Sequence, residues 1–282
     1  MTTGRPLSIG HSPDADDAFM FYALAKEAVT VPGYEIQHVM EDIETLNRRS
    51  VTGDLDVTAV SAAHYPAIAD KYRIMSCGAS IGRNYGPALV TTEPVEREEL
   101  AGKRIGIPGE YTTSWLLFRI FFEHEIEPVF LDFDAVTPAV QDGSVDAGIL
   151  LHEGQILYEQ QGLHRVMDLG QEWFAATGLP IPLGLDLIHR RLGEAGQSIA
   201  KALYDSIVYA REHEEDALDY ALGFGRGIDR EDGRRFVRMY VNEDTVDMGE
   251  DGRKALETLY GMAEERGLIA RAPVIDIIQA DA

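Results

Sequence analysis

Short apolar segments alternate with amphipathic segments through the first half of the chain, and this alternation constrains the fold more than any other feature. The apolar segments have the length and composition of buried strands; they are residues 6–10, 34–39, 55–60, 87–91, 104–107, 127–132 and 146–151. Helical periodicity falls between them, in residues 18–25, 41–51, 115–122 and 135–141. Strands and helices that alternate at such short spacing predict an α/β architecture with largely parallel sheets.

The pattern changes after Gly193, where helical segments follow one another without strands. These predicted helices are residues 194–212, 214–221, 230–241 and 250–266, and together they would cover the α/β part. A chain of 282 residues is long for one compact core and suits two lobes of roughly 100 to 150 residues each.

The charge balance argues against several classes of partner. The chain has 48 acidic and 25 basic residues, which gives a formal net charge of -23. Nucleic acid and anionic membrane surfaces are therefore not expected as partners, because both attract basic proteins. The acidic excess could serve solubility or reflect a salty cytoplasm, and the sequence leaves both explanations open.

Cysteine content and the lack of long apolar segments indicate the compartment. Cys77 is the only cysteine, so neither an intrachain disulfide nor a cysteine-based metal cluster is expected. The first residues show no basic segment followed by an apolar one, and no apolar run reaches the roughly 18 residues of a membrane span. We therefore expect a cytoplasmic protein without membrane contact.

His152 stands directly after the apolar strand of residues 146–151. In open α/β sheets ligands bind at the carboxyl ends of the strands, so a histidine there is placed for chemistry; the alternative is an ordinary loop histidine. The segment that ends at Ser61 has a similar construction, with a helix, a glycine cap, one acid and a strand that ends in a polar side chain. If the chain forms two related lobes, Ser61 and His152 would face one another across a cleft.

Other polar residues follow the first strand or begin a helix. Ser12 and three aspartates follow the first strand, where they would cap the next helix or lie near a ligand. Thr112 and Thr113 follow Pro108-Gly109 at the start of a helix, where free backbone N–H groups and the helix dipole attract anions. These two threonines are candidates for binding a carboxylate, although they could also do no more than cap the helix.

Two further candidates are Asn47 and Gly86. Asn47 would point from its helix toward the cleft or lie on the surface, and Gly86 would bring backbone close to a ligand or shape a crossing strand. The eight histidines show no His-x-x-x-His spacing. The chain also has no phosphate-loop motif and no glycine-rich dinucleotide loop after a strand. We therefore expect neither a metal nor a cofactor.

A series of short motifs runs through nearly the whole chain in one order. They are SP at 12–13 with Asp17, EDIETLNR at 41–48, SAAHY at 61–65, GP at 86–87, PGEYTT at 108–113, HE at 152–153, DLG at 168–170 and GLPIPLG at 178–184. With these motifs the chain resembles the periplasmic-binding-protein-like enzymes of the futalosine route to menaquinone, and among them most of all the 1,4-dihydroxy-6-naphthoate synthases.

This resemblance implies a fold and an activity. The fold would be of the type II periplasmic-binding-protein-like class, with a ligand cleft between two lobes that are joined by two crossing strands near residues 89–92 and 185–189. Residues 92–186 would form the small lobe, and residues 1–91 with the helical part, 187–282, the large lobe. By resemblance His152 would be the base of a cofactor-independent lyase that converts cyclic dehypoxanthine futalosine, a small carboxylated substrate, to 1,4-dihydroxy-6-naphthoate. An ordinary histidine has a pKa of about 6.5, which suits that task, and Glu153 would orient the ring or lie at the surface.

One loop departs from the family pattern. The naphthoate synthases carry Ser-Pro-Cys-Pro-Asn-Asp-Thr-Phe where residues 12–19 of this chain read SPDADDAF. Two additional carboxylates, Asp14 and Asp16, therefore stand where a carboxylated substrate would lie. Chorismate dehydratase of the same pathway and a non-catalytic solute-binding protein remain alternatives, although a binding protein of an importer would need an export signal. The sequence leaves the oligomeric state open.

Overall fold

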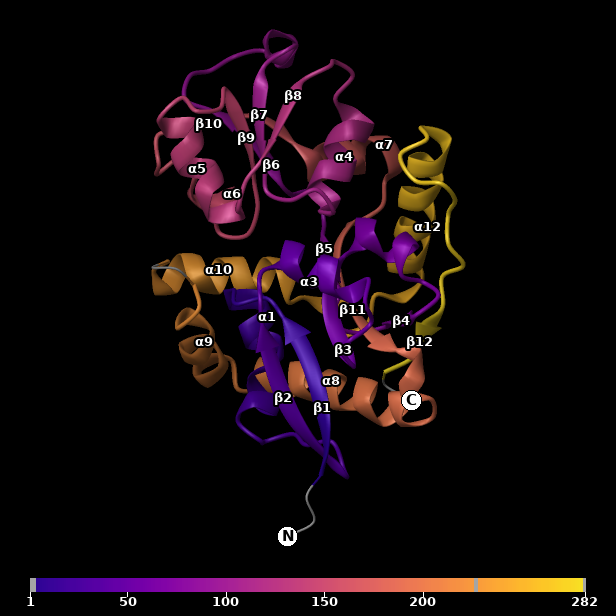
Figure 1. Ribbon diagram of the computed structural model, residues 1–282. Helices are drawn as coiled ribbons and strands as arrows, with labels where there is room; N and C mark the ends of the chain where they lie inside the picture. The colour runs from indigo at the N-terminus through magenta and orange to yellow at the C-terminus, as the bar shows by residue number, and fades with distance from the viewer. Residues whose placement is uncertain (1–3, 226–227, 281–282) are drawn as a thin grey trace.

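The chain folds around two β-sheets that lie one above the other in Figure 1. The computed structural model describes residues 4–225 and 228–280. The larger sheet has the strand order β12-β4-β11-β3-β1-β2, and β5 pairs with β11. Its strands are β1 (Arg5–His11), β2 (Tyr34–Met40), β3 (Val57–Ser61), β4 (Tyr72–Met75), β5 (Ser80–Gly82), β11 (Ile181–His189) and β12 (Ile277–Ile278).

The smaller sheet has the order β10-β6-β9-β7-β8. Its strands are β6 (Ala88–Thr91), β7 (Arg104–Ile107), β8 (Glu127–Phe130), β9 (Ala147–Leu150) and β10 (His164–Asp168). One end of each sheet is parallel, since β1 pairs in parallel with β2 and β3, and β7 with β8 and β9. The strands next to the passages between the sheets are antiparallel, because β11 runs against β3, β4 and β5, and β6 against β9 and β10. The expected α/β class is confirmed, whereas the sheets are less uniformly parallel than the sequence predicts.

The chain passes from the larger to the smaller sheet between Gly82 and Ala88, and returns between Asp168 and Ile181. The crossings expected at residues 89–92 and 185–189 are therefore misplaced, because those residues pair within β6 and β11, each inside one sheet. The division of the chain into lobes at residues 92 and 186 stays a prediction.

Helices cover both sheets. In the first two thirds of the chain they are α1 (Ala15–Met20), α2 (Tyr22–Ala25), α3 (Ile43–Ser50), α4 (Thr113–Phe121), α5 (Phe133–Gln141), α6 (Gly154–Leu157) and α7 (Leu169–Thr177). The four predicted helices after Gly193 are confirmed as α8 (Ala195–Glu212), α9 (Glu214–Leu222), α10 (Arg230–Tyr240) and α12 (Gly249–Glu265). A short helix that was not predicted, α11 (Glu243–Val246), lies between the last two. Helices α8, α9 and α10 pack against α1 or α2, and α12 contacts both β11 and α4, so it runs along the side of both lobes (Figure 1).

The apolar core extends through both lobes. Strands β3, β6 and β9 are buried at every position, as expected of strands that are covered on both faces. One cluster of buried side chains reaches from Val60 and Ile74 in the larger sheet to Ile105 and Ile149 in the smaller one. Within residues 4–225 and 228–280, no helix has the length and apolar character needed to span a membrane.

Candidate active site

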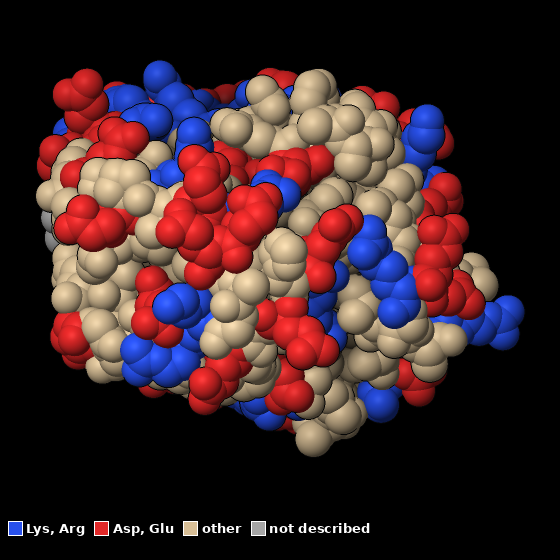
Figure 2. Space-filling view, turned by 90° about the horizontal axis from the view of Figure 1, so that it is seen from above, with Lys and Arg blue, Asp and Glu red and all other residues tan. Residues whose placement is uncertain are grey.

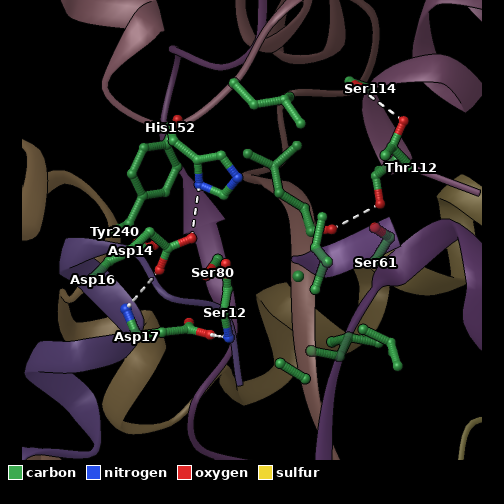
Figure 3. A pocket seen from close by; sticks show the side chains of 18 of the residues that line it. Ser12, Asp14, Asp16, Asp17, Ser61, Ser80, Thr112, Ser114, His152 and Tyr240 are labelled. Carbon is green, nitrogen blue, oxygen red and sulfur yellow. Dashed lines mark hydrogen bonds and ion pairs between the residues drawn. The ribbon is translucent and has the colours of Figure 1, made fainter. Parts of the chain in front are cut away.

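A pocket lies where the carboxyl ends of β1, β3 and β9 meet the first turn of α4 and the strand β11 (Figure 3). Its polar lining residues are Ser12, Asp14, Asp16, Asp17, Ser61, Ser80, Thr112, Thr113, Ser114, His152, Gln155, Asp186 and Tyr240. Residues of both sheets contribute, so the pocket lies between the lobes. This is the position at which ligands bind in open α/β sheets.

His152 reaches the pocket from the loop after β9 through a strained backbone. Its φ angle is +50°, in the left-handed region that residues other than glycine rarely adopt. The Phe133 ring packs edge-on against the imidazole, with 5.1 Å between the ring centroids. The Gln155 side-chain amide is oriented so that both its oxygen and its nitrogen form hydrogen bonds. Its oxygen accepts from the His152 backbone N–H at 3.0 Å, and its nitrogen donates to the Gly86 carbonyl and to the Tyr240 hydroxyl. Backbone strain of this kind is typical of functional sites and is retained only where the surroundings hold it.

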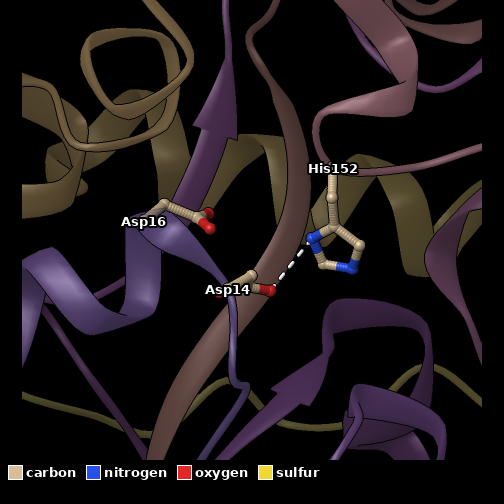
Figure 4. Close-up of side chains that lie close together, drawn as sticks. All are labelled: Asp14, Asp16 and His152. Carbon is tan, nitrogen blue, oxygen red and sulfur yellow. Dashed lines mark ion pairs between the residues drawn. The ribbon is translucent and has the colours of Figure 1, made fainter. Parts of the chain in front are cut away.

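Asp14 contacts the His152 ring from the other lobe. Its Oδ2 lies 3.0 Å from Nδ1 of His152 (Figure 4). The pair joins the segment after β1 in the larger sheet to the loop after β9 in the smaller sheet. Asp14 also caps α1, because its Oδ1 accepts from the Asp17 backbone N–H at 3.3 Å. Burial acts to raise the pKa of Asp14, but the His152 ring and hydrogen bonds from Asp16 and Ser12 outweigh burial and hold it well below its ordinary value. Asp14 is therefore ionised beside the imidazole.

Three further carboxyl groups in the pocket are driven toward the neutral form. Burial raises the pKa of Asp186 to about 8. Burial, followed by the charge of Asp14, raises the pKa values of Asp16 and Asp17 well above the ordinary value. Asp17 has a structural role as well, since its Oδ2 accepts from the Ser12 backbone N–H at 2.6 Å. Carboxyl groups that keep their protons can donate hydrogen bonds to a ligand as well as accept them.

Ser61 forms the opposite side of the pocket, and Asn47 holds it in place. Asn47 is completely buried, and its side chain accepts from the Ser61 backbone N–H at 2.8 Å and donates to Ser61 Oγ at 3.0 Å. Because Oγ accepts from the amide, the hydroxyl hydrogen of Ser61 remains available to donate into the pocket.

The first turn of α4 continues this side of the pocket. Thr112 Oγ1 caps the helix by accepting from the Trp115 backbone N–H at 3.3 Å, and lies 3.0 Å from Ser114 Oγ. Thr113 Oγ1 donates to the Leu183 carbonyl at 2.7 Å and accepts from the Ala63 backbone N–H at 3.0 Å. The capping function that the sequence left open is thus present in Thr112, which also lines the pocket.

The structure brings most of the expected site residues together. Those that line the pocket are Ser12, Ser61, Thr112, Thr113 and His152. As expected, Ser61 and His152 lie at the ends of strands of different sheets, because Ser61 ends β3 and His152 follows β9. Asn47 and Gly86 stand behind the lining. Gly86 packs so closely on Gly170 that a Cβ atom on it would lie 2.8 Å from the Gly170 nitrogen. Their predicted roles in binding stay predictions.

Other site residues were missed or misjudged from the sequence. Glu153 is 6% exposed, so its interpretation as a surface acid is wrong. Asp186 was not singled out, although an acid between Leu185 and Leu187 in an apolar segment is a signal of a functional carboxyl group. Tyr240 was missed as well, because its helix reaches the pocket only through the packing of α10 against α1.

With this geometry in place, comparisons with known proteins identify the family. The sequence profile of a family described as menaquinone biosynthesis matches residues 7–265. The chain belongs to the menaquinone biosynthesis family. It is 38% identical to a 1,4-dihydroxy-6-naphthoate synthase of Thermus thermophilus over 95% of this chain and 97% of the relative. It is 36% identical to the synthase of the same name from Streptomyces coelicolor, over 93% and 94% of the two chains. Relatives named as synthases support an enzyme of menaquinone biosynthesis.

Solved structures confirm the fold. A protein of Archaeoglobus fulgidus with a crystal structure is 47% identical and superposes with a TM-score of 0.90, over 94% of this chain and 98% of that one. The alkanesulfonate-binding protein SsuA of Xanthomonas axonopodis is only 14% identical but superposes over 99% of both chains with a TM-score of 0.73. The fold is therefore the periplasmic-binding-protein-like fold that the resemblance implied, and this fold suits a small-molecule ligand between its lobes.

Proposed function

We propose that this member of the menaquinone biosynthesis family converts cyclic dehypoxanthine futalosine to 1,4-dihydroxy-6-naphthoate, with His152 as the catalytic base. The observation that supports this role is the pairing of His152 with the ionised Asp14 inside the pocket between the lobes. The names of the two curated relatives support the choice of substrate and product.

The pairing with Asp14 selects the imidazole nitrogen that acts. When His152 Nδ1 donates its proton to Asp14 Oδ2, the neutral ring keeps a lone pair on Nε2. In Figure 3 this second nitrogen points toward the middle of the pocket. The negative charge of Asp14 stabilises the imidazolium that forms once Nε2 has accepted a proton.

The side of the pocket formed by Ser61 and α4 is suited to hold the substrate carboxylate. The Ser61 hydroxyl and the N-terminal end of α4 offer hydrogen-bond donors and a positive dipole end. With the carboxylate there, the sugar-derived ring lies toward His152. The base removes a C–H proton, the electrons of that bond form a double bond, and the ring C–O bond breaks as its oxygen takes up a proton. This elimination opens the ring ahead of aromatisation.

The test is turnover of cyclic dehypoxanthine futalosine, followed by mass spectrometry of the products, with EDTA present. Loss of a general base reduces rates about 10²- to 10⁴-fold, so we expect a decrease of that size in His152→Ala. His152→Asn is a second variant that is easier to fold, because asparagine tolerates the left-handed backbone at this position. It lacks the base and should be equally impaired. The exposed His124 gives a matched control, and His124→Ala should keep full activity.

Other outcomes would contradict this proposal in different ways. Full turnover in a folded His152→Asn variant would show that His152 is not the base. Turnover of chorismate in place of cyclic dehypoxanthine futalosine would indicate a chorismate dehydratase. Binding of the substrate without turnover would favour a solute-binding protein.

A further inference from the structure

We propose that Asp14, Asp16 and His152 form a binding site for one divalent transition-metal ion. A carboxylate oxygen of each aspartate and a ring nitrogen of His152 all lie within 4.8 Å of one another. Asp14 and Asp16 come from the N-cap and first turn of α1, and His152 comes from the loop after β9 in the other lobe. Figure 4 shows the three side chains directed toward one shared space.

Asp16 provides an observation that the Asp14–His152 pair does not explain. Its side chain is 6% exposed, and within residues 4–225 and 228–280 its buried Oδ1 has no hydrogen-bond partner. Buried polar atoms are almost always paired, so this unpaired carboxylate oxygen indicates a missing partner. In Figure 4 the Asp16 carboxylate points into the space beside the His152 ring.

The charge of the pocket indicates that the missing partner is a cation. Four aspartates line the pocket, and no lysine or arginine occurs among its described lining residues. The fourth acid, Asp186, also has both side-chain oxygens buried without a partner among the residues that the structure describes. A buried carboxylate that is not neutralised by a proton needs a counter-charge, and a divalent ion would supply it for Asp14 and Asp16 together.

The ligand set favours ions of the zinc class over magnesium. Two carboxylate oxygens and one imidazole nitrogen suit Zn²⁺, Mn²⁺, Fe²⁺ or Co²⁺, whereas Mg²⁺ prefers oxygen ligands only. The 3.0 Å between Asp14 Oδ2 and His152 Nδ1 is also short enough for neighbouring ligands on one ion, each about 2.0–2.1 Å from it. An ion on Nδ1 would leave the proton of the neutral ring on Nε2. The ion would then compete with the role of His152 as a base, and would inhibit turnover.

The site can be tested without substrate, by isothermal titration of the EDTA-treated protein with ZnCl₂ and, separately, with MgCl₂. We expect one Zn²⁺ per chain, and at least tenfold weaker binding of Mg²⁺. Asp16→Asn should weaken Zn²⁺ binding at least tenfold. Asp17→Asn is the matched control, because it removes a neighbouring acid in the first turn of α1 that lies outside the trio, and its amide oxygen can still accept from Ser12. Its Zn²⁺ affinity should stay within threefold of the wild-type value.

A spectroscopic measurement tests the histidine ligand independently. Co²⁺ bound to the protein should give visible absorption bands that disappear in His152→Asn and persist in His124→Ala. Equal Zn²⁺ affinity in the wild-type protein and in a folded Asp16→Asn variant would overturn the site, and so would the absence of any stoichiometric Zn²⁺ binding. Because the turnover assay contains EDTA and the titrations contain no substrate, failure of the metal site and failure of the proposed activity are distinguishable.

Discussion

At the scale of single residues, Asp186 connects the pocket to the pH dependence of stability. Its folded-state pKa of about 8 lies above the ordinary 3.8, so between these values the folded protein keeps a proton that the unfolded chain has released. The stabilisation from this group is therefore complete below pH 4 and is lost as the pH rises through 8. Through this one group, the free energy of unfolding falls by at most about 1.4 kcal/mol per pH unit.

The prediction is that Asp186→Asn removes this part of the pH dependence. Urea denaturation at pH 5 and pH 8 should show that the wild-type protein loses more free energy of unfolding between the two pH values than the variant does. Asp70→Asn, at a carboxyl group whose side chain is 76% exposed, should leave the pH dependence of the wild type unchanged. Equal losses in the wild type and in Asp186→Asn would show that this carboxyl group is not held neutral by the fold.

At the scale of elements, the two passages between the sheets meet at a pair of glycines. A Cβ atom on Gly170, the second residue of α7, would lie 2.1 Å from the backbone carbonyl carbon of Tyr85. Neither backbone can move without shifting β6 or α7, so Gly170→Ala should destabilise the protein by at least about 2 kcal/mol. Gly261→Ala in α12 is the control, because nothing lies within 4 Å of the added methyl group. It should be neutral or stabilising by about 0.5–1 kcal/mol. Comparable denaturation midpoints for the two variants would contradict the close contact.

The same elements show what the sequence can and cannot predict. Strands such as β7 and β9 were predicted because they are continuous apolar segments between turns, and the position of His152 follows from the end of β9. Strand β10 was missed because it begins with exposed His164 and Arg165, and β12 because it has only two residues. The contact between Asp14 and His152 could not be predicted, because it depends on how the lobes face one another rather than on any local pattern.

At the scale of the whole molecule, the net charge of -23 predicts that salt stabilises the protein. Acidic side chains cover much of the face in Figure 2, with fewer basic ones between them. Salt weakens both the repulsion among these acids and the attraction within exposed ion pairs. Each exposed pair contributes only about 0–1 kcal/mol, while the excess of 48 acidic over 25 basic residues acts on the whole folded state.

We therefore expect the melting temperature to rise by several degrees between 0.05 and 1 M KCl, over which the screening length shrinks to about 3 Å. Replacing the exposed Glu123 and Glu125 by glutamine should raise the melting temperature at low salt and reduce the gain from added KCl, because it removes part of the repulsion. KCl should reduce the difference in melting temperature between the wild-type protein and this variant. A non-electrolyte at matched osmolality should leave that difference unchanged. A melting temperature that falls with KCl would mean that the exposed ion pairs outweigh the repulsion. The acidic surface would then serve solubility rather than stability at high salt.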